Sequence, residues 1–196
     1  DVRGAEAIFV PRVDEAKILQ APDLVERAGY DLCELLGGDP AHGATLAKHR
    51  YDFRLMLEIA TPHGPANVHL HPAERRRAAL VLGHGAGGGI GAGDLVAATD
   101  EALSAGLTVA LVEQPYRVAG RRSPAPAKQL EAAWTAVVEH LRANELAGLP
   151  LIVGGRSLGA RVACRTSAEL GAVAVLCLAF PLQPPRRKSG KPSESR

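Results

Sequence analysis

Hydrophobic and polar residues alternate in two neighbouring segments, residues 52–59 (DFRLMLEI) and 66–71 (ANVHLH). A period of two is typical of strands that bury only one face. The residues between them, 61–65 (TPHGP), include the proline and glycine that reverse a chain most readily. The pattern predicts an antiparallel β-hairpin.

Continuous aliphatic runs follow the hairpin, and segments with helical spacing separate them. An apolar run without polar interruption is typical of a strand covered on both faces of a parallel sheet. The predicted strands are residues 79–83, 107–112, 149–153 and 172–180, and the predicted helices are residues 94–105, 126–146 and a third from Ser157 to about Gly171. This alternation predicts an α/β fold, a three-layer sandwich whose mostly parallel sheet begins with the antiparallel hairpin.

Changes in composition divide the chain into three parts. Residues 50–182 form the α/β domain. Residues 1–49 are predicted to be a helical extension, because leucines and an alanine recur on one helical face over residues 23–36. Residues 183–196 contain proline, lysine, arginine and serine with almost nothing apolar, which predicts a basic tail or linker.

Composition and charge then exclude several function classes. Of the 196 residues, 46% are hydrophobic and 22% charged, as in soluble globular proteins. The tail is basic and the rest slightly acidic, so nucleic-acid binding is not expected. Cys33, Cys164 and Cys177 are widely spaced, which favours free thiols in a reducing, cytoplasmic compartment. A membrane span and a signal peptide are not expected either.

The strongest chemical signal is the G-x-S-x-G segment at residues 155–159 (GRSLG), between a predicted strand and a predicted helix. A sharp strand-to-helix turn projects the serine hydroxyl beyond the strand ends and needs glycines beside it. Ser157 is therefore the predicted nucleophile. The backbone N–H of Leu158, at the helix N-terminus, is predicted to stabilise an oxyanion.

A glycine-rich segment, residues 84–89 (HGAGGG), follows the first parallel strand. Such a loop can aim a backbone N–H at the same oxyanion, and Ala86 or Gly87 is the predicted donor. His84 is predicted to shape this loop, with general-base action as the lesser alternative. The order and context of the two motifs are those of an α/β-hydrolase, with no cofactor or metal.

Residues 50–185 as a whole carry a family resemblance. The segments LVLGHGAGGG, EQPYRVAGRR, LEAAW, LIVGGRSLGARVA and LCLAFPLQPP resemble the α/β-hydrolase-like family shared by bacterial hydrolase-type proteins, Tex-type proteins and a subunit of a histone acetyltransferase complex. The resemblance covers about two-thirds of the chain. It implies an α/β-hydrolase fold with a serine at the elbow, and it leaves the small, ester-like substrate undefined.

The sequence departs from the full hydrolase pattern after the serine. The acid and the histidine should follow it, yet residues 158–196 contain no Asp and no His, and their acids are Glu169 and Glu194. We therefore expect the last strands to be missing and the domain to be an incomplete catalytic unit. An open sheet edge with Val173, Val175 and Leu178 would then favour self-association or a protein partner.

Two other function classes remain open at this stage. Residues 83–88 also satisfy G-x-G-x-x-G, and Glu113 ends the next strand, where a ribose-binding acid of a dinucleotide site would stand. A non-catalytic interaction domain of the same fold is the second alternative.

Several further charged residues invite interpretations. Candidates for attracting an anionic substrate are Arg117, Arg121 and Arg122, which otherwise belong to a solvated loop. Arg156 and Arg161 flank the elbow, and Glu113 and Glu131 are candidate partners for either of them. The histidines of the hairpin, His63, His69 and His71, are expected at the surface rather than on zinc.

Overall fold

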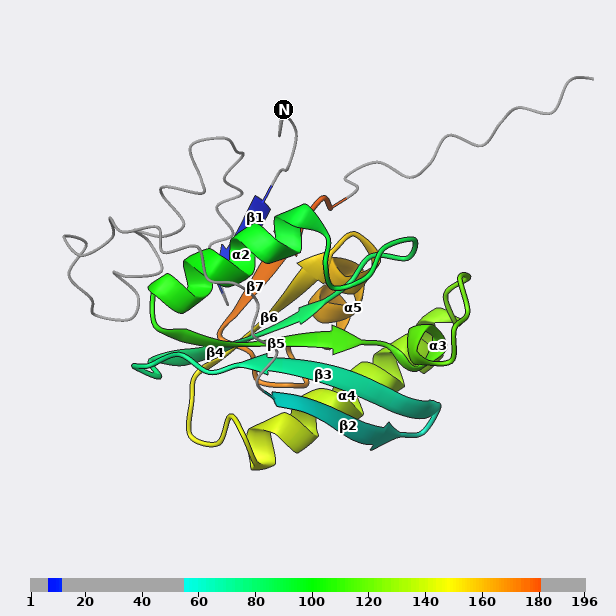
Figure 1. Ribbon diagram of the computed structural model, residues 1–196, viewed down its shortest axis with the longest axis horizontal. Helices are drawn as coiled ribbons and strands as arrows, with labels where there is room; N and C mark the ends of the chain where they lie inside the picture. The colour runs from blue at the N-terminus through cyan, green and yellow to red at the C-terminus, as the bar shows by residue number, and fades with distance from the viewer. Residues whose placement is uncertain (1–6, 12–54, 181–196) are drawn as a thin grey trace, which may run out of the picture.

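The computed structural model describes residues 7–11 and 55–180, and the strands of these residues form one seven-stranded mixed sheet (Figure 1). Its order is β1-β7-β6-β4-β5-β3-β2. The strands are β1 (Ala7–Pro11), β2 (Leu55–Thr61), β3 (Gly64–His71), β4 (Ala78–Gly83), β5 (Leu107–Glu113), β6 (Leu151–Arg156) and β7 (Ala174–Leu178). The helices are α2 (Gly93–Ser104), α3 (Pro115–Val118), α4 (Ala127–Ala143) and α5 (Leu158–Thr166). The predicted α/β fold is confirmed; the predicted helix at 23–36 and the tail lie outside the described residues.

The centre of the sheet is parallel and its β2–β3 end is antiparallel. β4 pairs in parallel with β5 and β6, and β6 with β7, while β3 joins β2 and β5 antiparallel. Alternate residues of β4 face different layers: Val81 lies in the cluster with Trp134 of α4, and Leu82 in the cluster with Leu95 of α2. Helices α4 and α5 thus cover one face and α2 the other (Figure 1), which buries both sides of the central strands.

The strand β1 corrects two expectations. It pairs antiparallel with β7, with Ile8 opposite Cys177, so the edge of β7 that we expected to be open is occupied by residues of the N-terminal segment. Val175 and Leu178 are buried, whereas Val173 is 41% exposed. The N-terminal 49 residues therefore contribute a strand to the sheet, which the prediction of a helical extension did not include. Five residues are too few to show a period, and the unpaired backbone of β7 supplies the partner.

Within the described residues, the helices are too short or too polar to cross a lipid bilayer.

Candidate active site

Ser157 occupies the turn between β6 and α5, as predicted. Its backbone has φ 50° and ψ −99°, a conformation that residues with a side chain rarely adopt. The Ser157 N–H donates a hydrogen bond of 2.8 Å to the carbonyl of Leu178 at the end of β7, and the Ser157 carbonyl accepts the first helical hydrogen bond, from Arg161. The turn is therefore held from both sides, by a neighbouring strand and by the helix that it starts.

Three glycines let the end of β4 touch this turn. A Cβ atom added to Gly155 or to Gly159 would collide with the carbonyl oxygen of Gly83, and one added to Gly83 would lie 3.2 Å from the Cα of Gly159. Two residues further on, a Cβ at Gly85 would lie 3.6 Å from the carbonyl oxygen of Arg156. The glycine-rich loop thus starts directly against the elbow, which confirms the predicted proximity.

The side chains of His84 and Tyr116 donate hydrogen bonds to the carbonyls of the first residues of this loop. His84 is 2% exposed; its Nδ1 donates to the Gly85 carbonyl at 2.8 Å, and its Nε2 accepts from the N–H of Gln114 at 3.2 Å. The Tyr116 hydroxyl donates to the Ala86 carbonyl at 3.4 Å, and burial raises the pKa of Tyr116, which keeps that donor protonated. These contacts join the loop to the end of β5.

The same hydrogen bonds orient the two alternative oxyanion donors of the loop, the N–H groups of Ala86 and Gly87. In a trans peptide the C=O and the following N–H point in opposite directions. Because the Gly85 carbonyl points toward His84, the N–H of Ala86 points away from the His84 ring. Because the Ala86 carbonyl points toward Tyr116, the N–H of Gly87 points away from the Tyr116 hydroxyl. Because both ring nitrogens of His84 have partners, this residue fits the support of the loop and not the role of a base.

Burial of His84 has a measurable consequence for stability. Burial lowers the pKa of His84 below its ordinary value, so on acidification the unfolded chain takes up a proton before the folded one does. The free energy of unfolding should therefore fall as the pH drops below about 6.5, by at most about 1.4 kcal/mol per pH unit for one proton, until the lower pKa of the folded state is passed.

Urea unfolding of the wild-type protein and of His84→Gln at pH 7.5, 6.5 and 5.5 measures this slope. The variant should show a shallower dependence. Burial and the nearby His69 also lower the pKa of His71, so part of the slope remains in the variant. Equal slopes in the two proteins would show that His84 does not contribute.

An ion pair that the sequence did not indicate joins the elbow to the first turn of α2. Arg156, directly before the nucleophile, donates from Nε to Asp94 Oδ2 at 2.8 Å, and the other oxygen of Asp94 accepts the N–H of Leu95 in the first turn of α2. Arg156 therefore pairs with Asp94 and not with either of its candidate partners, Glu113 and Glu131. An arginine can reach many acids from sequence alone, and only the fold brings the start of α2 to the elbow.

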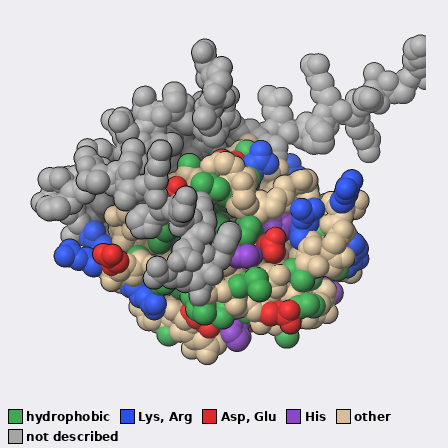
Figure 2. Space-filling model, viewed as in Figure 1, with side chains coloured by type: hydrophobic (Ala, Val, Ile, Leu, Met, Phe, Trp, Pro, Cys, Tyr) green, Lys and Arg blue, Asp and Glu red, His purple; other side chains and the backbone are tan. Residues whose placement is uncertain are grey.

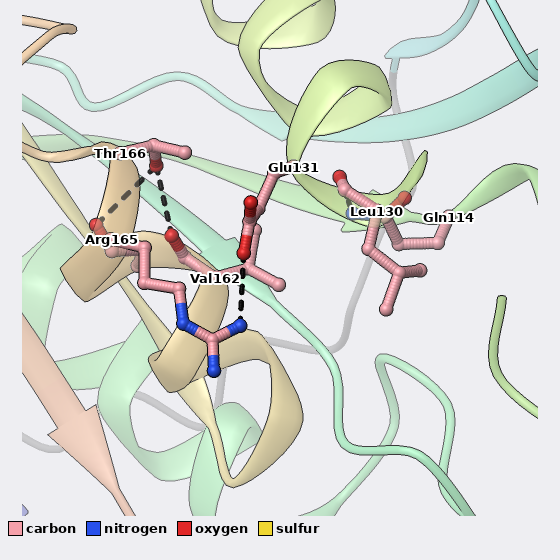
Figure 3. Close-up of polar contacts among 7 residues, drawn as sticks. Gln114, Leu130, Glu131, Val162, Arg165 and Thr166 are labelled. Atoms are coloured by element: carbon pink, nitrogen blue, oxygen red, sulfur yellow. Dashed lines mark hydrogen bonds and ion pairs between the residues drawn. The ribbon is translucent and has the colours of Figure 1, made fainter. Parts of the chain in front are cut away.

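Glu131 and Glu113 contact other side chains, Arg165 and His69 respectively. Glu131 on α4 pairs with Arg165 on α5 at 2.9 Å, which ties the nucleophile helix to its neighbour (Figure 3). In the same view, Gln114 donates from Nε2 to the carbonyl of Leu130 at 3.3 Å. The end of β5 is thus fixed to both α4 and the glycine-rich loop.

The histidines of the hairpin only partly follow expectation. His63 is exposed, but His71 is 8% exposed and His69 lies 3.5 Å from the carboxylate of Glu113. His69 and His71 alternate with Leu70 along β3, so they lie on the other face of that strand, where His71 is buried. No cluster of three or more His, Cys, Asp or Glu in the described part of the chain could hold a metal ion.

The arginines after β5 lie at the surface. Arg121 and Arg122 are exposed and Arg117 is partly so. In Figure 2, Lys and Arg side chains gather at the right of the molecule, where Figure 1 shows α3. The solvated-loop interpretation therefore describes Arg121 and Arg122, whereas Arg117 belongs to α3. Attraction of an anionic substrate stays a prediction.

Comparisons with known proteins agree with the α/β fold. Residues 76–196 match the model of the family described as "Alpha/beta hydrolase domain". No match was found among curated proteins. The Tex-type and acetyltransferase-subunit parts of the resemblance stay predictions.

Solved structures of other proteins, described as hydrolases or as a hydrolase homologue, share the fold at low sequence identity. XC6422 from Xanthomonas campestris, described as an a/b serine hydrolase without lid, is 22% identical with a TM-score of 0.55 over 60% of this chain and 57% of that one. A dienelactone hydrolase from Anabaena variabilis is 16% identical, with a TM-score of 0.54 over 62% and 59%. An alpha-beta serine hydrolase homologue from Coxiella burnetii is 11% identical, with a TM-score of 0.53 over 64% and 60%. The chain thus spans well under two thirds of each relative.

Proposed function

The chain belongs to the alpha/beta hydrolase domain family, and from this premise we propose that it is a serine hydrolase domain that acts on esters or similar small acyl compounds, with Ser157 as nucleophile. The observation that carries the proposal is the strained backbone of Ser157 directly against a glycine-rich loop. Backbone strain of this kind costs about 1–3 kcal/mol and is concentrated at active sites and ligand-binding sites.

In the proposed reaction, the Ser157 hydroxyl attacks the acyl carbon and the carbonyl oxygen becomes an oxyanion. The N–H of Leu158, at the start of α5, and the N–H of Ala86 or Gly87 are the proposed donors to that oxyanion. Hydrogen bonds of this kind act mainly in the transition state, and loss of one donor typically costs about 10²–10³ in kcat. His84 and Tyr116 are positioning residues for the loop and do not touch the substrate.

The Asp and the His that would complete a catalytic triad are not present among residues 158–196, which follow the serine. Both nitrogens of His84 are engaged. Without a base the serine hydroxyl is a weak nucleophile at neutral pH, and only the acceleration from oxyanion stabilisation and binding is left. We expect slow chemistry that is nevertheless specific for Ser157.

A fluorophosphonate tests this expectation, because it captures reactive serines covalently. The 196-residue chain should be labelled slowly, over hours, and the modified peptide should contain Ser157 before any other serine. Ser157→Ala should abolish this labelling, and Ser123→Ala, an exposed serine outside the elbow, is the control. Labelling spread evenly over the serines would contradict the proposal. Rapid labelling of Ser157 would show that a residue before it acts as base.

The second candidate function is a non-catalytic interaction domain of the same fold. Residues 158–196 contain no His and no Asp, with Glu169 and Glu194 as their acids, and this favours the second candidate for the chain tested alone. Complete absence of Ser157 labelling in a folded chain would favour this alternative. The dinucleotide alternative is weaker, because Glu113 faces His69 within 3.5 Å and the elbow would have no role.

A further inference from the structure

Two cysteines lie in contact on the elements that flank the elbow. Cys164 is on α5, the helix that Ser157 starts, and Cys177 is on β7, directly before the residue whose carbonyl accepts the Ser157 N–H. Their sulfur atoms are 3.4 Å apart. Both are free thiols, as expected from the sequence, but Cys164 is exposed whereas Cys177 is buried. The proposed hydrolase chemistry uses neither.

We propose that Cys164 and Cys177 are an oxidation site at which hydrogen peroxide forms a reversible disulfide between α5 and β7. The Cys164 thiolate attacks one peroxide oxygen, the O–O bond breaks, and hydroxide leaves, so that sulfur is oxidised to a sulfenic acid and peroxide is reduced. The Cys177 sulfur then attacks the sulfenic sulfur and expels the hydroxyl group, which takes up the thiol proton as water. A dithiol such as dithiothreitol reverses the bond by thiol exchange.

The environments of the two sulfurs assign their roles. The hydrogen bond from Cys177 lowers the pKa of Cys164 to about 7, with a smaller contribution from the positive charge of Arg165. The thiolate is the reactive form of cysteine, and Cys164 is also the member of the pair that peroxide can reach. The contact with Cys164 and burial raise the pKa of Cys177, which keeps it a thiol until a sulfenic acid forms beside it.

The geometry places the second step within reach. The sulfur atoms must approach from 3.4 Å to the about 2.05 Å of a disulfide bond. Because the pair is already in contact, a small shift of α5 toward β7 is sufficient. The bond would then tie the helix after Ser157 to the strand whose Leu178 carbonyl holds the Ser157 N–H. The site does not depend on whether Ser157 reacts.

Counting thiols in the full chain tests the proposal without any variant. The reduced protein has three cysteines; after mild treatment with peroxide it should retain one titratable thiol, and its mass should fall by about 2 Da for the two hydrogens lost. Peptide mapping should find Cys164 joined to Cys177. Dithiothreitol should restore all three thiols. Retention of three thiols in the folded protein, or a covalent dimer on a non-reducing gel, would overturn the proposal.

Variants separate the two steps. Cys33→Ser is the matched control, and it should form the disulfide at the wild-type rate. Cys164→Ser, at an exposed position, should form none. In Cys177→Ala, once circular dichroism has shown that it folds, peroxide should leave a sulfenic acid on Cys164 that dimedone traps. Disulfide formation that needs Cys33, or dimedone trapping on Cys33 and not on Cys164, would assign the chemistry to another pair.

Discussion

Gly159→Ala is expected to destabilise the protein by about 3 kcal/mol, although helix propensity alone predicts a gain of about 1 kcal/mol. Gly159 is the second residue of α5, and a Cβ there would collide with the carbonyl of Gly83 and lie 2.9 Å from the carbonyl oxygen of His84. Both obstacles are backbone atoms, which cannot rotate aside as a side chain could. The collision can be relieved only by moving α5 away from the end of β4.

Urea unfolding measures this effect, and Gly93→Ala is the matched control. Gly93 is also a helical glycine, the first residue of α2, but a Cβ there would meet nothing within 4 Å. The control should not lower the free energy of unfolding, and helix propensity predicts a gain of at most about 1 kcal/mol. If Gly159→Ala were as stable as Gly93→Ala, the close approach of β4 to the elbow would be wrong, and with it the placement of the loop beside Ser157.

Local chemistry explains why the elbow could be predicted from the sequence. Glycines around a serine, between an apolar run and a helical pattern, require a tight turn whatever lies around it. The identity of the obstacle could not be predicted in the same way. Gly155 and Gly159 are small because Gly83, more than 70 residues earlier, lies against them. A single sequence shows the small residue, and only the fold shows the atom that demands it.

Long-range pairing marks the limit of prediction at two other places. The ion pair of Arg156 with Asp94 joins residues 62 positions apart, and β1 joins β7 across most of the chain. Neither partner has a distinctive local pattern, since one is an acid in a first helical turn and the other a five-residue apolar segment. The central strands were predictable because their uninterrupted apolar runs reflect burial on two faces.

Ser157→Gly is expected to make the fold more stable than Ser157→Ala by about 1 kcal/mol, while both variants lose fluorophosphonate labelling. The conformation of Ser157, φ 50° and ψ −99°, is the mirror image of an ordinary extended one, which glycine adopts freely and alanine does not. Release of about 1–3 kcal/mol of strain exceeds the entropy cost of a new glycine, about 0.5–1 kcal/mol.

Thermal unfolding resolves this difference, since about 1 kcal/mol shifts the Tm of a chain of this length by about 2–4 °C. Comparison of the two variants removes the effect of the lost hydroxyl, because neither has it. Ala179→Gly is the control for strain at a residue that is not the nucleophile, since Ala179 has φ 47° and no proposed role in the reaction, and it should also raise the Tm. If Ser157→Gly were no more stable than Ser157→Ala while Ala179→Gly gained, the serine would not be strained. The strongest argument for its catalytic role would then be lost.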